Sequence, residues 1–331
     1  MSEILPSVTV IIAARPGQAE LQAVAGSFVL EYPRDKLDII VARGNQPSAQ
    51  RNAAMKVARG EVLYFLDDDS VPKPANLRRA AVYFRDPQVK MVGGPNLCPP
   101  EAPPLEQVFA LVMSSWLGFF SSRARYDAVG EARAASEKEL ILCNLSARRD
   151  AMVELGGFNE ALYPNEENAL MDELQKRGGK LVYDPEFTVL RRPRSSMKSF
   201  ARMLMTYGRG RAEQFRLHPT LGSAPNFVPP LFLVYLVLLP LLVWLLPFGK
   251  LLLLPLGLYG LILLAQGVVL AKRTQALFAV GALPLICLTH LLYGWGFWRG
   301  LFTTLKPDGQ REPVKVVLEP VSLPPAPNEP A

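Results

Sequence analysis

The sequence predicts an α/β fold with a mostly parallel sheet, followed by apolar helices long enough to cross a membrane. Three short apolar runs rich in β-branched residues are typical of strands buried on both faces: Val8–Ala14, Leu37–Ala42 and Val62–Leu66. Two helix-compatible stretches separate them, Gln18–Leu30 and Ser48–Arg59. Because strands that alternate with helices form βαβ units, we expect these runs to belong to one parallel sheet.

Three long segments toward the C-terminal end contain no Asp, Glu, Lys or Arg: Phe227–Leu246, Leu251–Ala271 and Ala276–Trp298. Each has at least 20 residues, which is enough to cross a hydrocarbon core of ~30 Å at ~1.5 Å per residue. With 50% hydrophobic residues and a mean hydropathy of +0.15, the chain is not a purely soluble protein. We expect three transmembrane helices, with Lys272 and Arg273 on the cytoplasmic side and the tail after Lys306 on the far side.

Positive charge is concentrated beside the first apolar segment. The chain carries 36 Lys and Arg against 30 Asp and Glu, a net charge of +6. Eight basic residues and one acidic residue lie between Arg191 and Arg216, whereas residues 1–190 carry 21 basic and 25 acidic side chains. By the positive-inside rule such a belt faces the cytoplasmic membrane surface, although a solvated helix face has the same composition. Because aromatic residues are not interleaved with the basic ones, we expect no nucleic-acid partner.

The composition divides the chain into four parts. We expect an α/β domain at 1–190, a basic juxtamembrane segment at 191–225, three transmembrane helices at 226–305 and a Pro-rich, disordered or extended tail at 306–331. The first residues have no basic start and no apolar run of a signal peptide, so the α/β domain is expected in the cytoplasm.

Two further features bear on the compartment. Gln107–Phe120 has 14 residues without an acid or a base, which suits an interfacial helix or a plain core helix better than a span. Cys98, Cys143 and Cys287 have no metal-ligand spacing, which favours reduced thiols over a disulfide or zinc framework.

An acidic cluster, Asp67–Asp69, directly follows the third predicted strand. In open α/β sheets, ligands bind at the carboxyl ends of the strands. Three adjacent carboxylates repel one another there and form a site for a hard divalent cation. The alternative is an acidic turn that caps the next helix, since Ser70, Pro72 and Pro74 are turn and helix-start residues. The position at the end of a β-branched strand favours the metal site.

A second acidic pair, Glu166-Glu167, precedes an amphipathic stretch, Ala169–Arg177. Carboxylates at a helix start commonly complement the helix dipole. Near a metal ion and a hydroxyl group, one of them can instead act as a general base. Adjacent residues of a helix point about 100° apart, so only one of the two side chains faces such a site.

The same two acidic clusters stand within a longer series of motifs in a set order. The series runs VTVIIAAR at Val8–Arg15, FLDDDSVP at Phe65–Pro72, CNLSARRDAMVELGGF at Cys143–Phe158, NEENALMDELQKRGGKLVYDPEFTVLRRPR at Asn165–Arg194, YGRGRAEQ at Tyr207–Gln214 and HLLYGWGFWRGL at His290–Leu301. This series resembles the family 2 inverting glycosyltransferases of GT-A fold. More narrowly, it is similar to bacterial membrane-anchored members that build exopolysaccharide or lipid-linked glycans, such as the succinoglycan-type glucosyltransferases.

The resemblance implies a GT-A fold and an enzyme of the bacterial inner membrane with its catalytic domain in the cytoplasm. The implied reaction transfers a sugar from a nucleotide-diphosphate sugar to a hydroxyl of a lipid-linked saccharide, with inversion at the anomeric carbon. Asp69, with help from Asp67, corresponds to the DXD motif that holds Mg²⁺ or Mn²⁺. Glu167 corresponds to the general base, with Glu166 orienting the acceptor or capping the helix.

The resemblance also assigns the substrate-binding residues. The donor nucleotide is expected at Ala13, Arg15, Arg51, Asp67 and Asp68. The acceptor or a phosphate is expected at Asn144, Arg148, Arg209 and Arg211, of which Arg209 and Arg211 are equally suited to bind lipid headgroups. Gly208 and Gly210 beside them let a backbone approach closely.

The sequence departs from the family pattern in three places. Many relatives read the uracil of the donor with an Asp-rich loop after the second strand, but Val41–Gln50 contains no acidic residue. Glu167 stands where Asp is usual, and the opening strand ends Ala13-Ala14-Arg15 where Pro is common. Two other functions therefore stay open, a polyprenyl-phosphate sugar synthase and a catalytically silent scaffold of a polysaccharide assembly complex.

Overall fold

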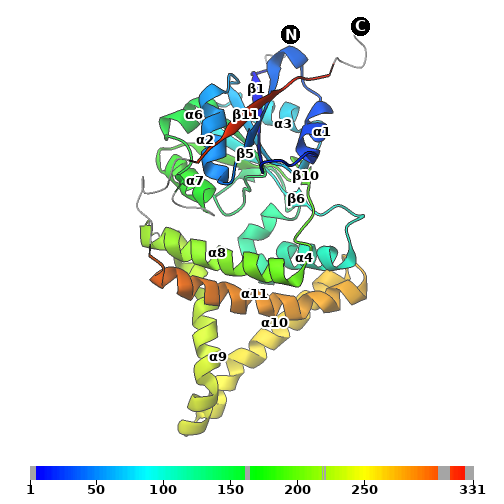
Figure 1. Ribbon diagram of the computed structural model, residues 1–331. Coiled ribbons are helices and arrows are strands. Elements are labelled where there is room, and N and C mark those ends of the chain that lie inside the picture. Colours follow the sequence, from blue (N-terminus) through cyan, green and yellow to red (C-terminus); the bar gives the residue numbers. More distant parts are fainter. Residues whose placement is uncertain (1–4, 161–164, 218, 220, 305–313, 325–331) are drawn as a thin grey trace. The chain divides into compact units, whose positions relative to one another are not determined.

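The computed structural model describes residues 5–160, 165–217, 219, 221–304 and 314–324. The chain forms two compact units (Figure 1). The first, called the sheet unit below, comprises Met1–Pro99, Ala124–Arg191 and Lys306–Ala331. The second, the helical unit, comprises Pro100–Arg123 and Arg192–Leu305. The sheet unit therefore includes the segment that the sequence predicted to be a separate tail.

An eight-stranded sheet in the order β11-β2-β1-β3-β8-β5-β9-β7 forms the centre of the sheet unit. Its strands are β1 Val8–Ala14, β2 Leu37–Arg43, β3 Val62–Asp67, β5 Val89–Gly93, β7 Arg133–Ala134, β8 Asn144–Arg148, β9 Lys180–Tyr183 and β11 Val317–Val321. The three apolar runs form β1, β2 and β3, which pair in parallel as predicted. β8 lies antiparallel between β3 and β5. The expected α/β class is confirmed, and the sheet is mixed: β1-β2, β1-β3 and β5-β9 pair in parallel, whereas β11-β2, β3-β8, β5-β8 and β7-β9 pair antiparallel.

Helices cover both faces of this sheet. They are α1 Gln22–Phe28, α2 Pro47–Val57, α3 Asn76–Tyr83, α6 Arg149–Glu154 and α7 Glu166–Lys176. Side chains alternate along β1, so that Val10 and Ile12 pack in the core cluster with α1 and α3, whereas Ile11 packs in the cluster with α2 and α7. Both faces of β1 are thus buried, which is why its sequence is continuously apolar.

A small second sheet lies beside the acidic cluster. It has three strands in the order β4-β10-β6, formed by β4 Val71–Pro72, β10 Val189–Leu190 and β6 Asn96–Leu97. β4 begins immediately after the turn that contains Asp67–Asp69. The pairing of Leu190 with Val71 therefore brings the residue that follows β10, Arg191, next to that turn.

The C-terminal strand overturns part of the expected membrane topology. β11 pairs antiparallel with β2 along its whole length. Val321 and Leu323 pack on one core cluster of the sheet unit, and Val316 and Leu318 pack on the other. A strand cannot hydrogen-bond into a sheet across a bilayer, so the expected position of the tail after Lys306 on the far side is wrong. This pairing allows only an even number of bilayer crossings within residues 192–304.

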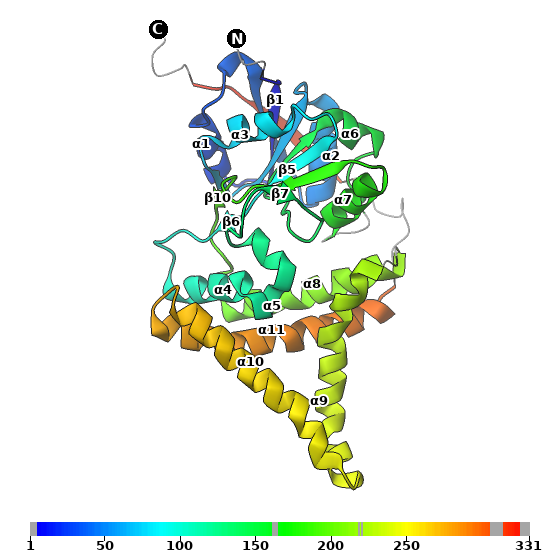
Figure 2. The ribbon, with the colours of Figure 1, turned by 180° about the vertical axis from the view of Figure 1, so that it is seen from behind.

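The helical unit contains three helices long and apolar enough to cross a membrane: Gly222–Leu245, Gly249–Ala271 and Ala276–Phe302. They coincide with the three apolar segments of the sequence. The first two comprise 3₁₀ turns followed by α9 Val228–Leu245 and α10 Leu254–Ala271. These two helices form a V whose tip points away from the other helices of this unit (Figure 2). Their apolar side chains are mostly exposed, as expected for helices that face lipid.

The third apolar helix, α11 Ala276–Phe302, lies along the basic helix α8 Met197–Leu217 in both views (Figures 1 and 2). Glycines allow this close contact. A Cβ atom on Gly208 would lie 2.1 Å from the carbonyl oxygen of Tyr293, and one on Gly296 would lie 2.1 Å from that of Met205. The close backbone approach expected at Gly208 thus serves helix packing.

Helix α4 Pro104–Ser114 packs against α11 and contacts α8. The short helix α5 Trp116–Phe119 follows it. The ring of Phe109 stacks on that of Phe200 of α8 at 4.1 Å between centroids. The predicted helix within 107–120 is therefore present as two helices. One side packs in the unit and the other leaves Trp116 and Phe120 exposed.

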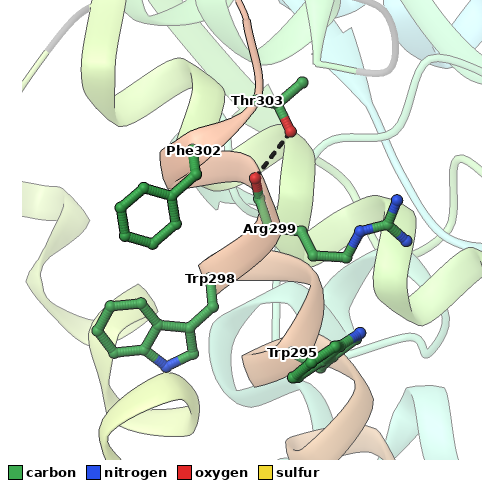
Figure 3. Close-up of a pocket in the computed structure, with 5 residues that line it drawn as sticks. All are labelled: Trp295, Trp298, Arg299, Phe302 and Thr303. Carbon is green, nitrogen blue, oxygen red and sulfur yellow. Dashed lines mark hydrogen bonds between the residues drawn. The ribbon is translucent and has the colours of Figure 1, made fainter.

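The C-terminal end of α11 carries an aromatic hollow, which Figure 3 shows in close-up. Trp295, Trp298, Arg299, Phe302 and Thr303 line it, and the hydroxyl of Thr303 donates to the carbonyl oxygen of Arg299 at 2.7 Å. Trp and Arg are typical of the membrane–water interface. None of the five lining residues is a carboxylate, so this hollow does not contain the predicted catalytic groups.

Candidate active site

The carboxyl edge of β1, β2 and β3 gathers residues expected to bind the donor. Ala13 of β1 lies directly opposite Asp67 of β3, and Arg15 follows the end of β1. The acidic cluster Asp67–Asp69 continues from β3 into a tight turn. β2 lies on one side of β1 in the sheet, and the chain then crosses back to place β3 on the other side. In open α/β sheets, ligands bind at the point where the strand order reverses in this way.

Two arginines pair with the carboxylates of the acidic cluster. Arg51 of α2 places its Nη2 2.7 Å from Oδ1 of Asp67. Arg191 places Nη1 3.1 Å from Oδ2 of Asp67 and Nε 2.5 Å from Oδ1 of Asp69. Both carboxylate oxygens of Asp67 are thus ion-paired, and Arg191 bridges the two residues of the DXD pattern.

Burial is the main influence on Asp69. It raises the pKa of this carboxyl above its ordinary value, and the nearby Asp67 and Asp68 add to the rise. Arg191 acts in the opposite direction. Asp68 is partly exposed, and its backbone carbonyl accepts a hydrogen bond from Ala23 N at 3.1 Å.

The acidic cluster fits a divalent cation that takes part of its ligands from the donor. Within the described residues no group of three or more His, Cys, Asp or Glu could hold a metal ion. Mg²⁺ usually binds through one or two carboxylates and completes its shell with water and substrate phosphates. The side chain of Asp69 is 44% exposed, and among the described residues only Oδ1 is ion-paired. Among the described residues no donor is recorded for Oδ2 of Asp69, so this oxygen is suited to coordinate a cation.

The second acidic pair lies at the first turn of α7. The side chain of Glu166 is 3% exposed, with Oε1 3.6 Å from Nη1 of Arg51. Its Oε2 is buried without a hydrogen-bond partner among the described residues. Burial and the neighbouring Glu167 raise the pKa of Glu166 to about 7, against the opposing effect of Arg51. Glu167 itself is half-buried. Arg51 therefore connects the two acidic clusters.

Asn144 has a structural role instead of the expected acceptor contact. Its side chain is fully buried at the start of β8. The hydroxyl of Tyr64 donates to its Oδ1 at 2.8 Å, and its Nδ2 donates to the carbonyl oxygen of Phe187 at 2.6 Å. Because these bonds use both ends of the amide, Asn144 orients the loop before β10 and is not available to a ligand.

Arg148 lies at the wrong end of the sheet for an acceptor-binding residue. It pairs with Val62, the first residue of β3, whereas Asp67 is the last. Its Nε donates to the carbonyl oxygen of Val89 at 2.9 Å, and its Nη2 donates to that of Phe84. The antiparallel direction of β8 decides this placement, which puts Arg148 at the opposite end of β3 from Asp67.

Arg209 and Arg211 both lie in the middle of α8, in the helical unit. Nε of Arg209 is 3.4 Å from Oε1 of Glu213, and Nη1 of Arg211 donates to Oε1 of Gln214 at 3.1 Å. Both are partly exposed on a helix with five basic residues. Their expected part in binding a phosphate or a lipid headgroup stays a prediction.

Sequence reasoning missed the contacts of Arg191, which it counted only as one member of the basic belt. It also missed Arg43, the last residue of β2. Arg43 Nε is 2.8 Å from Oε2 of Glu319 on β11, and its Nη1 donates to the carbonyl oxygens of Gln18 at 2.8 Å and Arg15 at 3.2 Å.

Comparisons with known proteins identify the family of the chain. Residues 2–206 match the protein family described as Glycosyltransferase like family 2. The succinoglycan biosynthesis protein ExoA of Rhizobium meliloti is 26% identical over 203 residues, which cover 59% of this chain and 56% of ExoA. The pre-mycofactocin glycosyltransferase of Mycobacterium tuberculosis is 27% identical over 206 residues, covering 58% of this chain and 37% of that protein.

Among solved structures, the mannosyltransferase PcManGT from Pyrobaculum calidifontis, in complex with GDP-Man and Mn²⁺, has 18% sequence identity and a TM-score of 0.49. That alignment covers 88% of each chain. The match to the two sequence relatives spans about half of ExoA and about a third of the mycobacterial protein.

Proposed function

The chain belongs to glycosyltransferase family 2, and we propose that it transfers a sugar from a nucleotide-diphosphate sugar to a hydroxyl of a lipid-linked saccharide during cell-surface polysaccharide synthesis. The carrying observation is that Arg51 links Asp67, at the carboxyl edge of the sheet, to Glu166 at the start of α7. In such a site one acidic cluster can hold the cation that binds a leaving diphosphate, and the other can accept the proton of an attacking hydroxyl. The name of ExoA, a succinoglycan biosynthesis protein, supports the polysaccharide context.

Asp69 and Asp67 would hold Mg²⁺ or Mn²⁺ in this reaction. When bound, the cation neutralises negative charge that develops on the leaving diphosphate. Arg51 holds Asp67 in place, and Ala13 and Arg15 at the end of β1 line the adjoining part of the donor site. No covalent intermediate on the protein is needed, because the acceptor attacks carbon one of the sugar from the face opposite the diphosphate.

Glu167 would take the proton from the attacking hydroxyl. It is half-buried at the first turn of α7 and so combines access to substrate with partial desolvation. Glu166 faces inward to Arg51 and keeps that guanidinium between the two clusters. The two neighbouring carboxylates thus have different surroundings and different proposed roles.

The enzyme would be held at the cytoplasmic face of the bacterial inner membrane by α9 and α10, which cross as a pair. α11 would lie in the membrane plane, since it follows α8, whose basic residues are costly in hydrocarbon: Lys198, Arg202, Arg209, Arg211 and Arg216. Two crossings agree with the return of the chain to β11 and keep Lys272 and Arg273 in the cytoplasm.

Reporter fusions test this topology. A reporter active only in the cytoplasm should be dark when inserted at Lys250, between α9 and α10, and bright when inserted after Arg273 or fused after the last residue. A dark C-terminal fusion would mean an odd number of crossings, which contradicts the pairing of β11 with β2.

Sugar transfer into extracted bacterial lipid tests the proposed reaction. Purified protein in detergent is incubated with radiolabelled nucleotide sugars, with Asp69→Ala as the negative control and Asp86→Ala, an exposed carboxylate paired with Lys180, as the matched control. Label in an oligosaccharide-lipid is the expected result. Label in a monosaccharide-lipid would instead assign a polyprenyl-phosphate sugar synthase, and label in neither across all donors would favour a silent scaffold.

A further inference from the structure

Arg191 is the residue of the site that its proposed chemistry leaves unexplained. Its side chain is 21% exposed and bridges Asp67 and Asp69 through two separate nitrogens. The backbone sets its position. Arg191 directly follows β10, which pairs with β4, and Arg191 N donates to the carbonyl oxygen of Leu97 at 3.0 Å. The small sheet therefore holds a guanidinium against the two carboxylates expected to hold a cation.

Both carboxylates of the DXD pair contact a guanidinium group before any ligand binds. Asp67 contacts Arg51 and Arg191, and Asp69 contacts Arg191, so two carboxylates face two guanidinium groups. A divalent cation that binds alone at Asp69 must approach a fixed positive charge within a few ångströms of the same carboxylate. At such separations like-charge repulsion weakens the binding of a bare cation.

When a diphosphate accompanies the cation, the interaction with Arg191 changes from repulsion to attraction. It adds two or more negative charges close to the cation, and a guanidinium is the side chain best suited to bind phosphate oxygens in a two-pronged manner. Arg191 donates from Nε and Nη1 to the carboxylates, and the same planar group carries five N–H donors in all. One residue can thus oppose a bare cation and attract a cation–diphosphate complex.

We propose that Arg191 makes the Asp67–Asp69 site selective for a divalent cation that arrives with a diphosphate, and that Arg191 then binds that diphosphate. The inference rests on the proposed function, because it assumes that the acidic cluster holds the cation of a nucleotide-diphosphate donor. It adds to that function a role for Arg191 and the expectation that the cation and the diphosphate bind together.

Calorimetric titration of the full chain in detergent tests the proposal without sugar transfer. The ligands are Mn²⁺ alone and preformed Mn²⁺–pyrophosphate. The parent protein should bind Mn²⁺ alone at least about tenfold more weakly than Mn²⁺–pyrophosphate. Arg191→Gln should bind Mn²⁺ alone more tightly than the parent, by about fivefold or more, and should bind Mn²⁺–pyrophosphate about tenfold more weakly.

The opposite signs separate this role from a structural one, since a merely damaged site would lose affinity for both ligands. Arg194→Gln removes an equal charge three residues further on, from an exposed position, and should change neither affinity. If Arg191→Gln is unfolded, Arg191→Lys serves instead: it should keep the weak binding of Mn²⁺ alone and lose affinity for Mn²⁺–pyrophosphate.

Parental or weaker binding of Mn²⁺ alone by folded Arg191→Gln would overturn the proposal. So would a parent protein that binds Mn²⁺ as tightly as Mn²⁺–pyrophosphate. Failure of the proposed function has a different signature, because it would leave these affinities as expected while no nucleotide sugar donates to lipid.

Discussion

The acidic cluster at the end of β3 and the acidic pair at the start of α7 are built from the same chemical groups but differ in how their charge is balanced. Asp67 and Asp69 are ion-paired at 2.5–3.1 Å with Arg51 and Arg191. Glu166 is more deeply buried, and its nearest cation, Arg51, lies 3.6 Å away. Burial raises the pKa of both Asp69 and Glu166, but Asp69 is directly ion-paired with Arg191, whereas Glu166, with a pKa of about 7, has only the more distant Arg51.

This difference shows how one fold separates two kinds of carboxylate chemistry. Groups that hold a cation must stay ionised, so ion pairs with arginine suit them. A group beside a proton-transfer step benefits from partial desolvation, which brings its pKa toward the working pH. Arg51 contacts both clusters, and so substitutions around it can test whether the two roles are truly separate.

The largest effect is expected at the first cluster. Asp69→Ala should lower the rate of sugar transfer by a factor on the order of 10³, because the charge on the leaving diphosphate loses its stabilisation. Excess EDTA should have the same effect on the parent. The rate is measured with radiolabelled donor, and full activity in EDTA would remove the metal role from this cluster.

Glu167→Gln should lower turnover by a factor on the order of 10² or more, since the amide cannot accept the proton. Binding of the donor and of the cation should stay close to that of the parent. Glu166→Gln should cost less. The comparison is made by single-turnover kinetics with each variant, and a parental rate in Glu167→Gln together with an inactive Glu166→Gln would move the base by one residue.

Arg51→Gln removes the guanidinium shared by the two clusters. We expect a loss of about 2 kcal/mol in stability, because Asp67 loses a partner in a largely buried setting and the side chain of Arg51 is only 6% exposed. The pKa of Glu166 should rise further, since Arg51 is the cation that lowers it. Thermal unfolding in detergent measures the first effect, and an unchanged midpoint would mean that the clusters do not depend on Arg51.

The smallest effect concerns pH. The pKa of Glu166 is raised from 4.5 to about 7, so between these values the folded chain retains a proton that the unfolded chain has released. Stability should therefore fall as pH rises through this window. The midpoint of thermal unfolding should drop by a few degrees from pH 5 to 8. In Glu166→Gln this part of the slope should vanish; an identical pH profile would place the proton elsewhere.

Local pattern was enough to predict the elements that carry the site. The runs that form β1, β2 and β3 are apolar except for Thr9 and Asp38, because most of their side chains are buried on both faces of the sheet. Asp67–Asp69 follows β3 and Glu166 begins α7, as expected. The pattern could not show that Arg148 lies at the opposite end of β3 from Asp67, because a five-residue strand has the same pattern in either direction. Nor could it show that both ends of the Asn144 amide bond to Tyr64 and Phe187.

The sequence by itself therefore determined the strand and helix segments, the two acidic clusters and the three apolar segments, because each depends on neighbouring residues. Only the tertiary structure decided which charges meet. Arg191 reaches Asp69 across 122 residues of sequence, and Glu319 reaches Arg43 across 276. It also distinguished α11 from α9 and α10, which composition alone leaves equivalent. The physical reason is that an ion pair or a helix contact leaves no periodic trace in the chain, whereas burial of a strand or helix does.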